Sequence, residues 1–97
     1  MAIRSFRRRE IGDFFFDGKA DRRAGWAGIA KIVIRSLDML HYSQRLEDLR
    51  SPPSNRLEAL KGDLRGFLSI RVNDQWRIVF RWTNQGPEDV DVVDYHV

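Results

Sequence analysis

The side chains with the clearest chemical potential lie in the second half of the chain: Glu58, Lys61, Arg77 and His96. Glutamate and histidine transfer protons, whereas lysine and arginine stabilise negative charge. A chain end usually frays, but residues 90–96 alternate like a β-strand, so we expect the imidazole of His96 to be held in place. The chain has no cysteine and only one other histidine, so we expect no metal site. This combination predicts acid–base chemistry on a phosphate without a metal or other cofactor.

Length and composition predict a single domain over residues 1–97. The chain is 42% hydrophobic and contains three tryptophans and six phenylalanines, which is ample for a compact core. Its net charge is +3, and most of its cations are arginines. The planar arginine fork suits phosphate, although a small basic domain can owe its charge simply to solubility. Both interpretations stay open on charge alone.

The amino-terminal segment predicts neither a secretory signal nor a membrane span. Arg4 and residues 7–9 are followed by only three adjacent apolar residues, 14–16, between Asp13 and Asp17. A signal peptide needs a longer apolar stretch, and a membrane-spanning helix needs about 20 apolar residues. Because disulfides are also impossible without cysteine, we expect a cytoplasmic protein.

The first half of the chain predicts one short strand and two helices. Residues 2–6 favour the strand, and residues 10–17 favour a short helix that Gly18 ends. The longer helix is indicated by apolar residues that recur three or four positions apart: Trp26, Ala30, Val33, Leu37 and Leu40. Asp21 is a candidate cap for this helix. His41 falls at its end, where we expect no catalytic role.

The second half predicts an antiparallel meander. After a proline-rich loop at residues 51–55, the hydrophobic period changes to two. Residues 67–72 and 75–82 favour neighbouring strands joined by a tight turn at 73–74, and a second turn at 85–88 leads into the terminal strand. A strand, two helices and a three-stranded meander together predict an α+β fold.

Side-chain alternation divides the predicted meander into an apolar and a basic face. The apolar side chains of the middle strand share the face that we expect the helices to cover: Trp76, Ile78, Phe80 and Trp82. The opposite face carries basic side chains: Arg71, Arg77 and Arg81. We expect this face to be open and Arg77 to contribute little packing, as on an ordinary solvated sheet surface. On the terminal strand Asp94 and His96 share one face and Tyr95 the other, and the pattern leaves open which joins the arginines.

The segment before the meander adds further candidates. Lys61 precedes Gly62, and a glycine lets the backbone turn and approach a ligand closely. Arg65 follows just before the sheet. Glu58 has two interpretations: a proton acceptor, or a solvent-facing residue of a helical turn.

Longer strings of the sequence resemble the HigB toxins of bacterial type II toxin–antitoxin systems, a branch of the RelE/ParE superfamily also called the plasmid maintenance system killer family. The strings that carry the resemblance are Ser51-Pro52-Pro53, residues 55–63, residues 69–78, Phe80-Arg81-Trp82 and residues 93–96. A weaker match at residues 3–6 extends it over nearly the whole chain. The resemblance implies a RelE-like fold, in which an N-terminal strand and two helices pack on an antiparallel sheet.

The resemblance implies a function as well. HigB toxins are ribosome-dependent endoribonucleases that cut mRNA in the decoding site of the 30S subunit and so inhibit translation. A HigA-like helix-turn-helix antitoxin neutralises them, and we expect operator DNA to be contacted only through that antitoxin. Metal-free cleavage requires a base for the 2′-OH, cations for the phosphate and an acid for the 5′-oxygen.

The resemblance assigns individual residues to the site. Positions that match or adjoin the family's active site are Glu58, Lys61, Arg77, Asp94, Tyr95 and His96. RNA and ribosome contacts are expected from further arginines: Arg56, Arg65, Arg71 and Arg81. Glu58 departs from the family pattern, because several HigB toxins carry histidine there, whereas YoeB toxins carry a glutamate that acts as the base. YoeB toxins also end in His-Tyr where this chain has His96-Val97, so no terminal tyrosine role transfers.

In the implied mechanism Arg77 carries the largest share, because a preorganised fork stabilises charge that grows on the phosphate. Either Glu58 or His96 is the base, and an imidazole also suits proton donation at neutral pH. Asp94 is expected to orient a neighbour, and Tyr95 to stack on a base or hold the backbone. Two other classes stay possible: a ParE-like toxin that acts on gyrase by binding, and a plain RNA-binding module.

Overall fold

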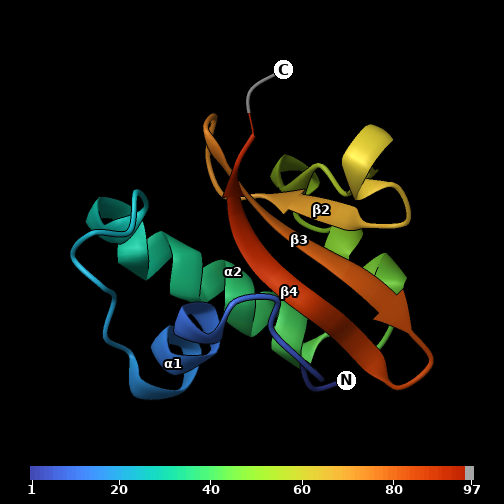
Figure 1. The fold of residues 1–97 in the computed structure, drawn as a ribbon. Helices are drawn as coiled ribbons and strands as arrows, with labels where there is room; N and C mark the ends of the chain where they lie inside the picture. Colours follow the sequence, from blue (N-terminus) through green and yellow to red (C-terminus); the bar gives the residue numbers. More distant parts are fainter. Residues whose placement is uncertain (96–97) are drawn as a thin grey trace.

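The computed structural model describes residues 1–95, which form two α-helices and a four-stranded antiparallel sheet (Figure 1). The helices are α1 (Arg9–Asp17) and α2 (Ala30–Tyr42). The strands are β1 (Glu58–Ala59), β2 (Leu68–Arg71), β3 (Trp76–Thr83) and β4 (Gly86–Asp94). The predicted α+β class is confirmed, and β1 adds a short strand that the sequence did not indicate.

Strands follow one another in the sheet in chain order, β1-β2-β3-β4, as expected of a meander. Ile70 lies opposite Ile78, and Ile78 lies opposite Val92, so apolar side chains form a row across three strands. The register shifts between Val79 and Arg81, where β4 carries one residue more than β3, as in a β-bulge. This register decides which side chains share a face.

The amino-terminal segment extends the sheet beyond β4. Phe6 forms a parallel bridge with Val90, and the backbone N–H groups of Arg4 and Arg7 donate to the carbonyls of Pro87 and Val90. The strand expected at residues 2–6 is therefore a short stretch of hydrogen-bonded chain that runs parallel to β4 at the sheet edge.

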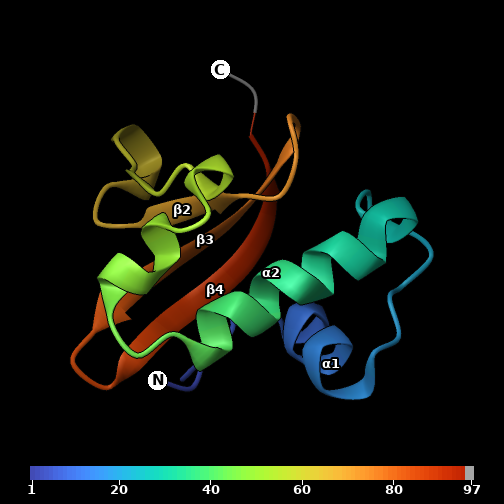
Figure 2. The same cartoon turned by 180° about the vertical axis from the view of Figure 1, so that it is seen from behind.

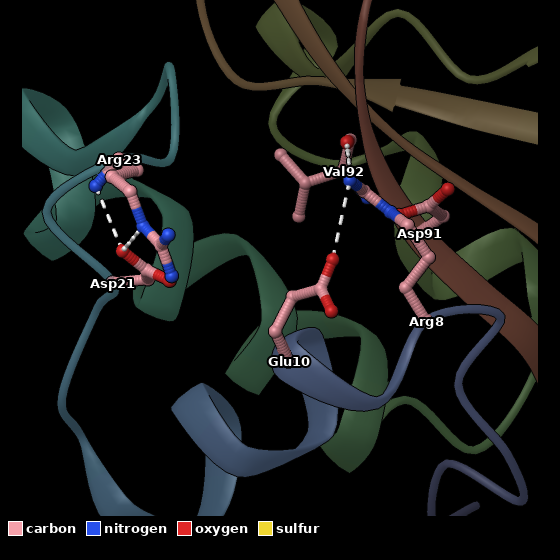
Figure 3. Close-up of polar contacts among 6 residues, drawn as sticks. All are labelled: Arg8, Glu10, Asp21, Arg23, Asp91 and Val92. Carbon is pink, nitrogen blue, oxygen red and sulfur yellow. Dashed lines mark hydrogen bonds and ion pairs between the residues drawn. The ribbon is translucent and has the colours of Figure 1, made fainter.

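Arg8 anchors this segment to the sheet (Figure 3). Its Nε donates to Asp91 Oδ1 at 2.8 Å, its second terminal nitrogen donates to the carbonyl of Val92 at 2.9 Å, and Glu10 lies 3.4 Å from its third nitrogen. The side chain of Asp91 is almost completely buried, so its charge is compensated by Arg8.

Both predicted helices are present, with one corrected boundary. Gly18 ends α1 in a left-handed conformation at φ 74°, which glycine adopts without steric cost. The long helix begins later than expected, at Ala30, after a short 3₁₀ turn at Ala27–Ile29. Asp21 does not cap it, because its carboxylate accepts hydrogen bonds from the backbone and side chain of Arg23 instead.

The core lies between the helices and the apolar face of the sheet. Figure 2 shows α2 running diagonally across the sheet, with α1 beside it and next to β4. The two layers contribute fully or almost fully buried side chains: Phe14, Val33, Leu37 and Leu40 from the helices, and Ile70, Ile78, Phe80, Val90 and Val92 from the strands. The helix-covered face predicted from Ile78 and Phe80 is confirmed.

Two further boundaries differ from the expectation. The second turn is confined to residues 84–85, because Gly86 already begins β4. Gly86 adopts φ 128°, and a Cβ there would lie 2.5 Å from the carbonyl oxygen of Ala2, so only glycine fits. Glu58 lies on β1 rather than on a helical turn, which corrects the structural interpretation of that residue.

Candidate active site

Arg77 lies in the middle of the sheet on the face opposite α2. Its neighbours on β3, Trp76 and Ile78, point to the helical side, so alternation places Arg77 on the other side as predicted. The expectation that it projects from an open face was wrong, because only 9% of Arg77 is exposed and Val79 beside it is fully buried. Neighbouring segments, and not α2, cover this part of the sheet.

Two acceptors hold one end of the Arg77 guanidinium. One terminal nitrogen donates to Ser69 Oγ at 2.7 Å and to the carbonyl of Arg56 at 3.3 Å. Ser69 is fully buried on the neighbouring strand β2. Arg56 has φ 46°, an uncommon conformation for a residue with a side chain, at the end of the short 3₁₀ helix Pro53–Asn55. The loop backbone and the sheet thus fix the guanidinium together.

Glu58 supplies the counter-charge. In the register of β1 with β2 it lies directly opposite Ser69, which brings it to the face that Arg77 occupies. Its Oε1 is 3.4 Å from the second terminal nitrogen of Arg77. The two side chains differ in exposure, at 49% for Glu58 and 11% for Arg77. The carboxylate is therefore accessible to a ligand while the guanidinium is held beneath it.

Tyr95 completes this cluster. The Arg77 Cζ atom lies 5.5 Å from the centroid of the Tyr95 ring, within the range of a cation–π contact. The backbone N–H of Tyr95 donates to the carbonyl of Gln75 at 2.8 Å, which holds the end of the described chain against β3. Of the two terminal residues that the structure describes, Asp94 and Tyr95, it is Tyr95 that joins Arg77.

Asp94 lies on the other face. It pairs with Trp76 in the register of β3 and β4, and its carboxylate accepts a hydrogen bond from the side chain of Gln75 at 2.9 Å. The expectation that Asp94 orients a neighbour thus finds Gln75 as one partner. His96 lies outside the described residues, so its predicted role stays a prediction.

Lys61 and Arg65 line a separate hollow at the edge of the sheet. With Leu60 and Gly62 they enclose a cavity of about 460 Å³, immediately after β1. Both cations are exposed.

The remaining predicted RNA contacts have different surroundings. Arg71 forms an ion pair with Asp74, and its guanidinium lowers the pKa of that carboxyl below its usual value. Arg56 is exposed, and its carbonyl serves Arg77 as described above. Arg81 is exposed and lies over the ring of Phe67.

Ser69 is the site residue that the sequence did not identify. Its pattern offered one signal: a small polar residue at the centre of a strand, on the same face as Arg71 and next to the strand that carries Arg77. Nothing in that pattern distinguished a buried acceptor from an ordinary solvated serine. Within residues 1–95, no three histidine, cysteine, aspartate or glutamate side chains are grouped so that they could hold a metal ion.

A second cavity lies on the other side of the molecule, beside α1. It measures about 510 Å³, and two tryptophans, Trp26 and Trp76, form part of its lining. Figure 3 shows the charged groups around it already paired, Arg23 with Asp21 and Arg8 with Glu10. The hydrogen bond from the Arg23 side chain lowers the pKa of the Asp21 carboxyl. This balanced set of charges does not favour one kind of ligand.

The whole fold is shared with a toxin of known structure. The chain superposes on the YoeB/ParE toxin from Agrobacterium tumefaciens over the full length of both chains, with a TM-score of 0.51 and 20% sequence identity. A two-helix layer on an antiparallel sheet thus defines a small α+β domain of the YoeB/ParE fold. No helix in the described part of the chain is long and apolar enough to cross a membrane.

Sequence comparison then gives the family. The family model for RelE-like toxins of the type II toxin–antitoxin system HigB matches residues 4–96, so the chain belongs to this family. Toxin HigB-1 of Vibrio cholerae is 39% identical over 84 residues, which are 87% of this chain and 86% of that toxin. A protein of Haemophilus influenzae is 41% identical over 58 residues, 60% of this chain and 57% of that protein. As a toxin of such a system, the protein has an antitoxin as its partner.

Proposed function

We propose that this toxin is a ribosome-dependent endoribonuclease that cuts mRNA in the decoding site by metal-free attack of the 2′-OH. The observation that carries the proposal is the ion pair between Glu58 and Arg77, a half-exposed carboxylate over a guanidinium that the sheet holds in place. A proton acceptor and a preorganised cation at one point are what phosphodiester cleavage by a neighbouring hydroxyl requires.

In the proposed first step, Glu58 accepts the proton of the 2′-OH while the 2′-oxygen attacks the adjacent phosphorus. One nitrogen of Arg77 is already engaged by Ser69 and Arg56, whereas the other faces Glu58. A non-bridging phosphate oxygen that binds this second nitrogen would replace the carboxylate there. Glu58 would then be released from its ion pair as the substrate arrives, which frees it to act as the base.

In the second half of the step, the bond from phosphorus to the 5′-oxygen breaks and that oxygen takes up a proton. We propose His96 as the donor, on the basis of the family resemblance. Lys61 and Arg65, exposed at the adjacent edge, would draw the phosphate backbone towards the site. Tyr95 would hold the Arg77 guanidinium in place through the cation–π contact with its ring. The products are a 2′,3′-cyclic phosphate and a free 5′-hydroxyl.

The proposed partners follow from this activity. The toxin would act in the cytoplasm on the 30S decoding site and its mRNA, with ribosome contacts from Arg56, Arg71 and Arg81. A HigA-like helix-turn-helix antitoxin would neutralise it, and operator DNA would be bound through that antitoxin alone.

Induced expression with primer-extension mapping of cellular transcripts tests the proposal. We expect new breaks within translated regions soon after induction of the intact protein, and no breaks with Arg77→Ala at equal expression. Arg23→Ala is the matched control, because Arg23 is a highly exposed arginine in the segment between the two helices. Growth arrest without mRNA breaks, accompanied by gyrase inhibition, would replace the proposal with the ParE-like alternative.

A further inference from the structure

Two arginines from distant parts of the chain lie over one aromatic ring. The Cζ atom of Arg7 is 5.7 Å from the centroid of the Phe67 ring, and that of Arg81 is 5.8 Å from it. Both distances fall within the range of cation–π contacts, about 6 Å. The arginines are exposed and the ring is half-buried, so both charges face solvent.

Each of these residues is held by its backbone. The N–H of Arg7 donates to the carbonyl of Val90 at 2.8 Å, and Arg81 lies within β3. The carbonyl of Phe67 accepts from the N–H of Leu60, and its own N–H donates to the carbonyl of Leu64, both at 2.9 Å. The backbone is therefore held at all three points, and the contacts with the Phe67 ring place the two guanidinium groups.

These two cations have no carboxylate partner within residues 1–95. Arg8, Arg23, Arg71 and Arg77 each form an ion pair there, whereas Arg7 and Arg81 form none. Glu88 lies directly opposite Arg81 in the strand register, yet the guanidinium is directed to Phe67. Two guanidinium groups beside one ring thus leave positive charge there that an anionic ligand would balance.

We infer that Arg7 and Arg81, held over Phe67, form a binding site for the phosphodiester backbone of RNA. The inference rests on the proposed function and extends it to a second contact on the same strand face. Arg77 and Arg81 are four residues apart on β3, about 13 Å along an extended strand. One bound RNA strand can therefore reach the cleavage site and this second site together.

The surroundings of the site favour the same ligand. Leu60, which donates to Phe67, belongs to the cavity that Lys61 and Arg65 line. The guanidinium groups of Arg7 and Arg81, which lie over Phe67, are thus linked through Leu60 to the segment that carries Lys61 and Arg65. Planar guanidinium forks bind phosphate oxygens in two-point geometry, which suits a polyanionic backbone.

The salt dependence of ribosome binding tests the inference. We would measure the dissociation constant at several salt concentrations for the parent protein and for Arg7→Gln, Arg81→Gln and the double variant. Ribosomes loaded with 2′-O-methylated mRNA, which lacks the attacking hydroxyl, prevent cleavage during the measurement. Arg23→Gln is the matched control with the same change in charge.

Each lost phosphate contact should reduce the slope of log K against log salt by about 0.7–0.9. We expect that reduction in each single variant, roughly twice as much in the double variant, and little change in Arg23→Gln. Empty ribosomes, measured in parallel, distinguish the source of the phosphates: a reduction that needs mRNA places the mRNA strand on the site, and one seen with both places ribosomal RNA there.

A slope that is unchanged in the double variant on both kinds of ribosome would overturn the inference. The same holds if the double variant binds ribosomes normally but loses affinity for the antitoxin, because the site would then be a protein interface. Cleavage of unmodified mRNA by the parent protein, followed alongside, tests the proposed function separately.

Discussion

Arg77 is buried in the sheet and is also the guanidinium that we propose contacts the substrate. A buried guanidinium costs several kcal/mol of desolvation unless its donors and charge are satisfied. Ser69 and the carbonyl of Arg56 satisfy one nitrogen, and Glu58 balances the charge from the solvent side. The contacts that satisfy the buried guanidinium also fix its direction, so in the proposed mechanism only Glu58 would move when a phosphate binds.

Ser69 should affect catalysis only through Arg77. Replacing it by alanine removes one hydrogen bond to a charged group, which contributes about 1.5–3 kcal/mol. We expect a 10- to 100-fold slower single-turnover cleavage by Ser69→Ala, with ribosome affinity unchanged. Ser36→Ala, which truncates a buried serine of α2, is the control and should keep the parental rate.

A double-mutant cycle separates this role from a general loss of packing. In the Arg77→Lys background the fork that Ser69 orients is gone, so Ser69→Ala should cost little more. An equal loss of rate in both backgrounds would show that Ser69 acts only on the stability of the sheet.

The sequence was sufficient to select Arg77 and Glu58 as candidates, but it did not predict the ion pair between them. Alternation along β3 gave the face of Arg77, because strand geometry has a strict period of two. Its burial depends on the loop that ends at Arg56 and on Tyr95, and neither contact has a periodic signal. For the same reason Ser69 looked like an ordinary solvated serine.

At the scale of elements, the segment from α2 to β1 positions Glu58 without forming a long helix or strand. It consists of short 3₁₀ helices, Leu46–Arg50 and Pro53–Asn55, followed by β1. Asn55 is buried and donates to the carbonyl of Leu49, which ties the two turns together. The geometry of the Arg56 carbonyl therefore depends on side-chain contacts within this segment.

Asp48 gives this segment a measurable pH dependence. Its carboxylate accepts the backbone N–H groups of Gln44 and Arg45, at 2.9 and 3.0 Å, and these bonds lower its pKa. A lowered folded-state pKa contributes stability above the unfolded value, about 4, and that stability is lost as the pH falls through the folded value. We expect Asp48→Asn to lower the melting temperature at pH 7 and to differ less from the parent at pH 3.

Thermal unfolding of both proteins across this pH range checks the prediction. Glu47→Gln, which changes the neighbouring exposed carboxylate, is the control. A melting-temperature difference between Asp48→Asn and the parent that stays constant from pH 7 to pH 3 would contradict the assigned role.

The observed starts of α2 and β4 show why local sequence patterns did not predict the element boundaries. The periodicity of residues 26–40 indicated one helix, yet residues 27–29 form a 3₁₀ turn and Asp21 binds Arg23 rather than the helix end. Gly86 and Pro87 are typical turn residues, but here they begin β4. The amino-terminal segment packs against Gly86, a long-range contact that no local pattern indicates.

At the scale of the molecule, the two faces of the sheet differ in what they carry. Its helical face carries the core, and its other face carries Arg77 together with the exposed Arg81. This division was predictable, because hydrophobic period and strand alternation fix the layers. The position of the antitoxin was not predictable, because no pattern in the sequence indicates which surface it covers.

Expression in a bacterial host tests the molecule as a toxin. We expect strong expression of the intact, soluble protein to arrest growth, and co-expression of its HigA-like antitoxin to restore it. The antitoxin need not cover Arg77, because blocking access to the proposed target, the ribosome, would be sufficient. Growth curves with and without the antitoxin measure both effects, and unimpaired growth at high levels of soluble toxin would contradict this prediction.

Single-turnover cleavage on purified, mRNA-loaded ribosomes tests the central claim most directly. We predict that Arg77→Ala slows cleavage by about 10²–10³-fold, comparable to removal of one oxyanion donor, while Arg23→Ala keeps the parental rate. Because Arg77 is buried, circular dichroism must first show that the variant is folded, and Arg77→Lys provides a version that keeps the charge. A folded Arg77→Ala protein that cuts mRNA at close to the parental rate would contradict the proposed mechanism.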